Sequence, residues 1–252
     1  MQTETDKILT MQALILAAGL GTRLRPLTND RPKALVEVGG MTLLERNLLN
    51  LCSQGVTRVV VNVHHFADQI IDFLNSRNWG TEVIVSDERD LLLDTGGALR
   101  RASRYFVDSM NIAMYNVDIL SPIRLLDLEA EMMVSDAEAV LAVSDRQTSR
   151  YLLFSHSGEL VGWHNTKTGE YLWVDKPMDE YKAFAFSGIS LFSPALVNLM
   201  PEADHPYPLI PELLKLAKHH TIKYLEHNPE QWLDVGKPDT LQQANQFITR
   251  YL

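Results

Sequence analysis

LILAAGLGTRLRPLTNDRPKAL, residues 14–35, is the stretch of this chain that best indicates its fold. It begins within an apolar run over residues 13–18, and a run that is apolar on both faces predicts a buried parallel strand. A loop rich in Gly, Arg and Pro follows and extends to Lys33. Because glycines directly after a strand let backbone N–H groups approach phosphates closely, the stretch predicts an α/β fold with an anion site at the end of the strand.

Strands and helices alternate through the first half of the chain beyond this loop. Thr42 and Glu45 have the T-x-x-E spacing of a capping box, which predicts the start of a helix, and Gly55 is a suitable stop. Apolar patterning predicts further strands over residues 57–63, 81–85 and 112–116, and helices over residues 66–74 and from Thr95, as N-cap, to about residue 106. This alternation predicts a parallel, doubly wound, Rossmann-like sheet.

The second half of the chain is richer in strands. Its pattern predicts strands over residues 137–143, 184–192 and 222–225, a hairpin with arms at residues 151–155 and 160–163, and helices over residues 209–219 and 239–249. We therefore expect one mixed α/β sheet that carries a β-rich lobe. No stretch reads as a linker, so residues 11–252 are expected to form one domain, with residues 1–10 as an extension.

Charge and composition exclude several classes of partner. The chain of 252 residues has a formal net charge of -9, whereas binding to nucleic acid needs a basic surface. Cys52 is the only cysteine, which excludes an internal disulfide and a cysteine-based zinc site. No apolar run approaches a membrane span, and residues 1–10 lack the features of a signal peptide. We expect a cytoplasmic protein with no nucleic-acid or membrane partner; its oligomeric state stays open.

The loop after the first strand combines glycines with cations. Leu24 stands where the fingerprint G-x-G-x-x-G needs its third glycine, and no Lys-Ser/Thr pair follows as in a P-loop. The alternative to a binding site is a surface loop whose basic residues are simply solvated. The cations that accompany Gly19 and Gly21 favour a polyanion site instead, because guanidinium and ammonium groups suit phosphate oxygens. These cations are Arg23, Arg25, Arg31 and Lys33.

Two aspartates are candidate ligands of a metal ion. Asp118 follows the strand expected over residues 112–116, and ligands of open α/β sheets bind at the carboxyl ends of strands. Asp234 lies among apolar neighbours in QWLDVGKP, residues 231–238, and a buried carboxylate needs a partner such as a metal. Carboxylate oxygens are ligands that Mg²⁺ accepts. The alternatives are a turn that begins at Asp118 and a cap of the last helix at Asp234.

Together these motifs resemble those of the sugar-1-phosphate nucleotidyltransferase family. Residues 16–33 resemble its signature L-A-A-G-x-G-T-R-L-x-P-L-T followed by P-K. Residues 116–118 resemble N-G-D, with Val117 in place of the glycine, and residues 232–238 resemble W-x-D-x-G-x-P. DTGG at residues 94–97 resembles the E-T-G-G loop, and DKP at residues 175–177, with Gly188 at the family spacing, resembles the E-K-P element.

The resemblance implies a nucleotidyltransferase of Rossmann-like fold, with residues 11–120 binding nucleotide and residues 121–252 binding sugar. It would join a nucleoside triphosphate to a sugar 1-phosphate and release pyrophosphate. The resemblance implies Mg²⁺ as cofactor, held by Asp118 and Asp234, and catalytic roles for Arg23 and Lys33 at the triphosphate. Implied nucleotide contacts are Gly19, Gly21, Thr22, Thr95 and Gly96, and implied sugar contacts are Asn116, Asp175, Lys176, Ser187 and Gly188, with Lys176 on the sugar phosphate.

The sequence motifs indicate the type of reaction but do not identify the nucleobase or the sugar. The DTGG loop and the chain length look most like the N-acetylmuramate 1-phosphate uridylyltransferase branch, or like mannose- and heptose-phosphate relatives. A phosphate monoester has a second pKa of about 6, so the attacking group is already mostly dianionic and no general base is required. Two other functions stay open: transfer to a non-sugar alcohol phosphate, such as a polyol phosphate, and nucleotide-sugar binding by a non-catalytic regulator.

Overall fold

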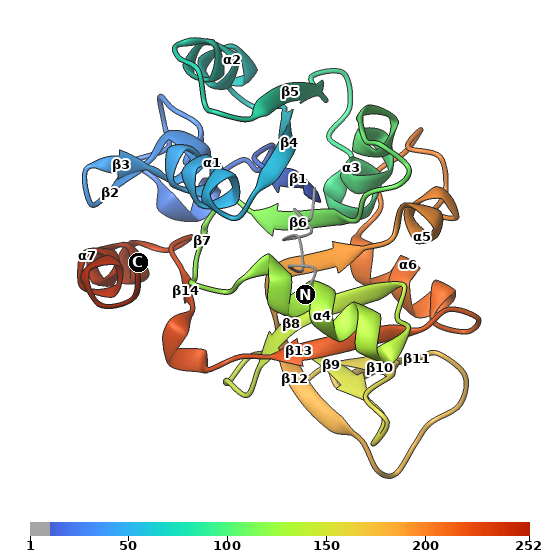
Figure 1. Ribbon diagram of the computed structural model, residues 1–252. Coiled ribbons are helices and arrows are strands. Elements are labelled where there is room, and N and C mark those ends of the chain that lie inside the picture. The colour runs from blue at the N-terminus through green and yellow to red at the C-terminus, as the bar shows by residue number, and fades with distance from the viewer. Residues whose placement is uncertain (1–10) are drawn as a thin grey trace, which may run out of the picture.

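The computed structural model describes residues 11–252, and the extension expected at residues 1–10 lies outside the described residues. Four parallel strands form the first half of the sheet in the order β6-β1-β4-β5 (Figure 1). They are β1 (Met11–Leu16), β4 (Val56–Val63), β5 (Glu82–Asp87) and β6 (Ile112–Asn116). The alternation of strands and helices therefore predicted this part of the topology correctly.

Side chains of β1 point alternately into two cores, one on each face of the sheet. Ile15 packs with α1 (Leu43–Ser53) and α2 (Ala67–Asn75), whereas Leu14 packs with α3 (Asp94–Ala102) and α6 (Leu209–Leu216). The side chains of Leu14 and Ile15 are both fully buried. A strand covered on both faces has no polar face, which explains the continuous apolar run in the sequence.

The strand β12 (Lys182–Phe192) joins the two halves of the molecule. It pairs antiparallel with β6 on one edge, and with β8 (Ala139–Ser144) and β9 (Arg150–Phe154) elsewhere along its length. β10 (Leu160–Asn165) and β11 (Glu170–Trp173) extend the sheet beyond β9, and β13 (Ile222–Glu226) lies parallel to β8. All ten strands belong to one mixed sheet, so the expected mixed α/β architecture with a β-rich lobe is confirmed.

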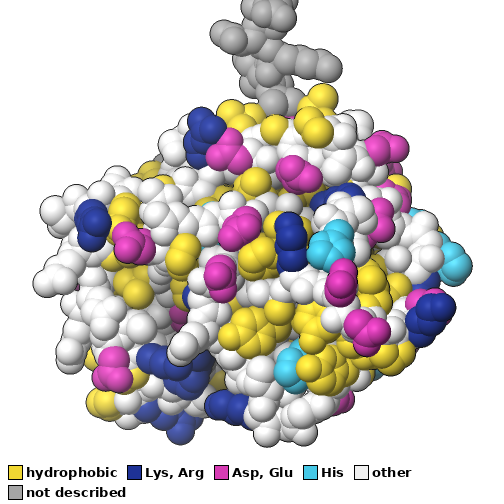
Figure 2. Space-filling view, turned by 90° about the horizontal axis from the view of Figure 1, so that it is seen from below, with side chains coloured by type: hydrophobic (Ala, Val, Ile, Leu, Met, Phe, Trp, Pro, Cys, Tyr) yellow, Lys and Arg dark blue, Asp and Glu magenta, His cyan; other side chains and the backbone are white. Residues whose placement is uncertain are grey.

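The β-rich lobe presents aromatic rings to solvent. Figure 2 views the molecule from below Figure 1, and hydrophobic side chains and histidines lie together on that face. On β10 and β11 the rings of His164 and Tyr171 stack with centroids 3.8 Å apart, and those of Tyr171 and Trp173 lie parallel at 5.6 Å. The His164–Tyr171 pair joins β10 to β11 across the strands, whereas Tyr171 and Trp173 are neighbours on one face of β11. Ring contacts of both kinds stabilise the outer hairpin.

Short elements complete the fold. A small hairpin, β2 (Glu37–Val38) with β3 (Met41–Thr42), precedes α1. α5 (Pro194–Asn198) lies near α3, and α7 (Pro238–Tyr251) lies beside β2 at the chain end (Figure 1). β7 (Ile119–Leu120) pairs with β14 (Leu233–Asp234), far apart in sequence. Within residues 11–252, none of the helices combines the length and apolar character that crossing a bilayer requires.

Helix starts reveal where local signals were sufficient and where they failed. Thr42 caps α1 as expected, accepting a bond from the Glu45 amide at 3.1 Å, but the Glu45 carboxylate pairs with Arg77. The prediction of Thr95 as an N-cap was wrong: α3 begins at Asp94, and Thr95 Oγ1 accepts from the Leu209 amide at 3.0 Å. No helix was expected over α4 (Leu125–Ser135), although its sequence LLDLEAEMMVS is rich in good helix formers. Its first amide is capped by the distant Gln54 side chain.

Candidate active site

The loop after β1 folds back so that its cations face the strand ends. Gly21 has φ +64°, and a Cβ there would lie 3.1 Å from the Thr28 side chain and 3.2 Å from that of Lys33. Thr28 Oγ1 donates to the Gly21 carbonyl at 2.8 Å and holds the turn closed. A short 3₁₀ helix, Thr22–Leu24, follows and carries Arg23. The positive φ therefore favours glycine at position 21, and a side chain there would also crowd Thr28 and Lys33.

The pairing of β7 with β14 brings Asp118 and Asp234 together. Asp234 lies opposite Ile119, and the Val235 amide donates to the Asp118 carbonyl at 2.9 Å. Arg23 reaches both carboxylates, with N–O separations of 3.9 Å to Asp118 and 4.0 Å to Asp234. Lys33 forms an ion pair with Asp118. Two of the four predicted cations, Arg23 and Lys33, therefore form one cluster with the predicted metal ligands. Arg25 and Arg31 are exposed outside this cluster, and Arg31 pairs with Asp30 instead.

Burial gives this carboxylate pair an unusual electrostatic character. Burial raises the pKa of Asp234, and the neighbouring Asp118 carboxylate raises the pKa further, whereas Lys33 lowers it. Asp118 itself is 7% exposed. Two carboxylates that disfavour each other's charge in a partly dry site are stabilised by a cation between them. The pair thus fits a divalent metal ion that takes oxygen ligands.

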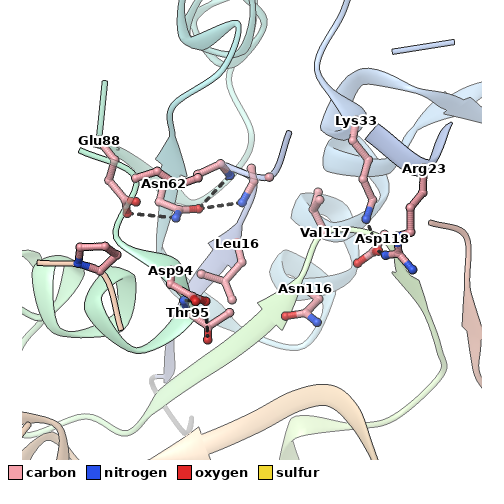
Figure 3. Close-up of a pocket in the computed structure, with 15 residues that line it drawn as sticks. Leu16, Arg23, Lys33, Asn62, Glu88, Asp94, Thr95, Asn116, Val117 and Asp118 are labelled. Atoms are coloured by element: carbon pink, nitrogen blue, oxygen red, sulfur yellow. Dashed lines mark hydrogen bonds and ion pairs between the residues drawn. The ribbon is translucent and has the colours of Figure 1, made fainter. Parts of the chain in front are cut away.

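A cavity of about 470 Å³ opens beside this cluster at the carboxyl ends of β1, β4 and β6. Figure 3 shows Arg23, Lys33 and Asp118 at one side, and Glu88, Asp94 and Thr95 at the other. The lining between these two groups includes Leu16, Ala17, Ala18, Gly19 and Asn116. Arg23 and Lys33 both lie at one end, called here the cationic end, whereas Glu88 and Asp94 lie at the other. The cavity is therefore suited to a ligand whose phosphates lie at the cationic end.

The far end of the cavity is organised by Asn62 and Glu88, which sequence reasoning did not identify. Asn62 Oδ1 accepts from the Ala17 amide at 2.7 Å, and its Nδ2 donates to Glu88 Oε1 at 3.0 Å. Glu88 Oε2 accepts from the Leu93 amide at 3.3 Å, and burial raises the pKa of Glu88. The available signal was Asn62 itself, a polar residue near the end of the apolar run TRVVVNV.

Of two predicted nucleotide contacts on α3, Thr95 lines this cavity and Gly96 does not. Thr95 lines the cavity, but its hydroxyl oxygen is engaged by the Leu209 amide. Gly96 is buried outside the lining, and its amide donates to the Tyr207 carbonyl at 3.0 Å. The position of Gly96 is explained by the close approach of Tyr207, because a Cβ there would lie 2.7 Å from the Tyr207 ring.

Replacing Gly96 with Ala is expected to destabilise the fold by about 1–3 kcal/mol, the usual cost of overpacking a core. Tyr207 cannot easily move away, since it is 5% exposed and its hydroxyl donates to the Pro201 carbonyl at 2.7 Å. The measurement is thermal unfolding. The melting temperature of a chain of this size falls by roughly 2–4 °C for each kcal/mol of destabilisation. Gly19→Ala is the control, because no atom lies within 4 Å of its Cβ position. Equal melting temperatures for the two variants would contradict the packing argument.

The predicted sugar contacts divide into two groups. Asn116 lines the cavity. Gly188, with φ +74°, packs against the Asn116 side chain, since a Cβ at Gly188 would be 2.7 Å from Asn116 Nδ2. Ser187 is fully buried, and its hydroxyl donates to His227 Nε2 at 2.7 Å, so the side chain does not face the cavity. Asp175 and Lys176 lie in an exposed segment after β11, outside the cavity lining.

Comparison with solved structures identifies the same architecture in other proteins. HddC from Yersinia pseudotuberculosis, solved with GMP-PN, superposes with a TM-score of 0.73 at 22% identity, covering 95% of this chain and all of the other. The inositol-1-phosphate CTP transferase from T. maritima gives a TM-score of 0.74 at 21% identity, covering 96% of each chain. The fold is therefore that of nucleotidyltransferases with a Rossmann-like sheet.

Sequence comparison defines the family. A model described as "Nucleotidyl transferase" matches residues 12–251, so the chain belongs to the nucleotidyl transferase family. It is 33% identical to the N-acetylmuramate alpha-1-phosphate uridylyltransferase of Caulobacter vibrioides over 235 residues, which is 90% of this chain and 92% of that protein. It is 27% identical to the mannose-1-phosphate guanyltransferase of Pichia angusta over 237 residues, but spans only 61% of that protein. The suspected family is confirmed.

Proposed function

We propose that this protein transfers a nucleotidyl group from a nucleoside triphosphate to a sugar 1-phosphate, giving a nucleotide sugar and pyrophosphate. The observation that carries this proposal is the cluster of Arg23, Lys33, Asp118 and Asp234 beside the cavity at the carboxyl ends of β1, β4 and β6. The cluster supplies cations for phosphates and paired carboxylates for a metal. The family membership of the chain supports the same reaction.

The cavity suggests how the substrates lie. The triphosphate would lie at the cationic end, against Arg23, Lys33 and the open backbone at Gly19. The nucleobase would extend towards Glu88 and Thr95 at the other end. The sugar phosphate would approach past Asn116, on the side of Gly188. This arrangement brings the attacking phosphate oxygen to the α-phosphorus and points pyrophosphate towards Arg23, so positioning accounts for much of the catalysis.

Asp118 and Asp234 are the residues that would hold Mg²⁺. When bound, Mg²⁺ would neutralise phosphate charge and help to orient the two substrates. The attacking phosphate needs no base, because it is mostly dianionic at neutral pH. Arg23 and Lys33 would stabilise the charge that develops on the departing pyrophosphate. The work of the protein is therefore to hold two polyanions together in a fixed orientation.

We propose N-acetylmuramate 1-phosphate and UTP as the first substrates to test, because the Caulobacter relative carries that activity in its name. Such a product would make the protein a supplier of cell-wall precursors. The experiment is a matrix of nucleoside triphosphates against sugar 1-phosphates and a polyol phosphate, read by pyrophosphate release with Mg²⁺. Release with the polyol phosphate alone would replace the sugar assignment, and binding without release in any combination would favour the regulator.

Replacing Lys33 with Met is expected to lower kcat by about 10²–10³-fold, the usual cost of removing one group that stabilises transition-state charge. The fold should survive, because Lys33 is a cavity-lining side chain that forms its ion pair with Asp118. Steady-state pyrophosphate release provides the measurement. Lys218→Met, at an exposed lysine beyond α6, is the control and should behave as wild type. A Lys33 variant with wild-type kcat would remove this residue from the mechanism.

A further inference from the structure

A bulge in β12 lies next to the active site. In the pairing of β12 with β8, Phe186 lies opposite Val143 but Ser190 lies opposite Leu141, so β12 carries extra residues between these points. Gly188, with φ +74°, is one of them. A bulge interrupts the ladder and leaves backbone carbonyls that need other donors.

Two side chains from elsewhere supply those donors. Arg146 Nη2 donates to the Phe186 carbonyl at 2.7 Å, and Trp232 Nε1 donates to the Ser187 carbonyl at 2.7 Å. The Arg146 guanidinium also lies over the Trp232 ring, 3.9 Å from its centroid. A cation over an indole face is attracted by the ring, more strongly where water is partly excluded. Arg146 and Trp232 therefore form one unit that is fastened to the bulge.

This unit connects directly to the carboxylate pair. Trp232 is two residues before Asp234 on the segment that forms β14, and the same bulge presses Gly188 against Asn116, two residues before Asp118. Asp234 is also close enough for its charge to act on Arg146. Burial lowers the pKa of the Arg146 guanidinium, and the Asp234 carboxylate raises that pKa by a smaller amount. The positions of Asp118 and Asp234 thus both depend on contacts with one short stretch of β12, residues 186–188.

We propose that Arg146 is a positioning residue for Asp234: by clamping Trp232 onto the β12 bulge, it sets the second carboxylate opposite Asp118. This inference rests on the proposed function, because it assigns Arg146 to the metal site of that reaction. Arg146 does not touch the substrates in this scheme. Groups that orient metal ligands from behind typically matter by about 10–100-fold in metal affinity or activity.

The test uses Arg146→Met and Arg146→Lys in the full chain, with Mn²⁺ as a paramagnetic probe. Mn²⁺ binding is titrated by electron paramagnetic resonance with a triphosphate analogue that cannot be cleaved. We expect Arg146→Met to weaken Mn²⁺ binding by about 10-fold or more. Arg146→Lys keeps the charge but loses the planar fork and the stacking, so it should fall between wild type and Met.

Kinetics provide the second readout. The Mg²⁺ concentration that gives half-maximal pyrophosphate release should rise in Arg146→Met, and excess Mg²⁺ should restore a large part of kcat. Trp232→Phe, which keeps a ring but loses the donor to Ser187, should shift the same parameter in the same direction. Arg150→Met is the matched control, since this exposed arginine lies in the same lobe on β9.

The outcomes separate this proposal from the proposed function. If the wild type binds Mn²⁺ and Arg146→Met binds it as tightly, with an unchanged Mg²⁺ dependence, the positioning role is overturned even though the enzyme works. If no substrate pair gives turnover but Arg146→Met still weakens Mn²⁺ binding, the positioning role stands and the reaction is wrong. A wild type that binds no Mn²⁺ overturns both. Should Arg146→Met fail to fold, as judged by circular dichroism, Arg146→Lys and Trp232→Phe decide the question.

Discussion

Asp118→Asn is expected to lower kcat/KM for pyrophosphate release by at least about 10³-fold, which corresponds to roughly 4 kcal/mol of transition-state stabilisation. Asn keeps the shape of the side chain but removes the negative charge that would hold a divalent metal. The substitution also takes away the ion-pair partner of Lys33. Because Asp118 occupies the centre of the cluster, with Arg23 and Asp234 on its other side, no neighbouring group can replace it.

The measurement is a titration of activity against Mg²⁺ for Asp118→Asn and Asp234→Asn. Both variants should lose turnover and keep the circular dichroism spectrum of the wild type. Asp108→Asn, at an exposed aspartate far from the cavity lining, is the control for a change of one charge. Activity within about tenfold of wild type in both active-site variants would remove the metal assignment, because neither carboxylate would then be needed.

Elements with a strong local pattern were predictable from sequence. β6 has the predicted bounds, residues 112–116, and the hairpin of β9 and β10 has its turn at the expected residues. Apolar runs and the Thr42 cap are local signals, so they do not depend on the rest of the fold. The start of α3 depends instead on Leu209, which is distant in sequence and whose amide occupies the Thr95 hydroxyl. Such tertiary contacts override local preference.

The candidate site was predictable to the extent that its residues belong to contiguous motifs. Arg23, Lys33, Asp118 and Asp234 were named from such motifs, and the structure places them together. Pairing of β7 with β14 achieves this, and strands of two residues are too short to show any periodicity. Asn62, Glu88 and Arg146 were missed because their importance lies in what they contact across the fold. Each is a single polar residue without a motif of its own.

The segment after β14 makes a second prediction of large effect, at Gly236. Its amide donates to Asp234 Oδ1 at 2.7 Å, so the backbone lies directly against the carboxylate pair. A Cβ at this position would lie 2.7 Å from Asp234 Oδ1, 2.8 Å from Asp118 Oδ2 and 2.9 Å from Arg23 Nη2. Its φ lies outside the left-handed region, so an alanine there is not strained by its backbone conformation. The constraint at Gly236 is space within the site.

Gly236→Ala is therefore expected to reduce kcat by about 10²-fold or more, because small displacements of positioned groups are costly in catalysis. The added methyl group must push Asp118, Asp234 or Arg23 away, which separates the ligands of the metal and weakens its binding. Mn²⁺ titration and pyrophosphate release measure the two effects. Gly96→Ala is the opposite case, since its methyl meets the buried Tyr207 ring and should lower the melting temperature instead. If Gly236→Ala kept both metal affinity and kcat, the two carboxylates and Arg23 could not be acting as a closely packed metal and phosphate site.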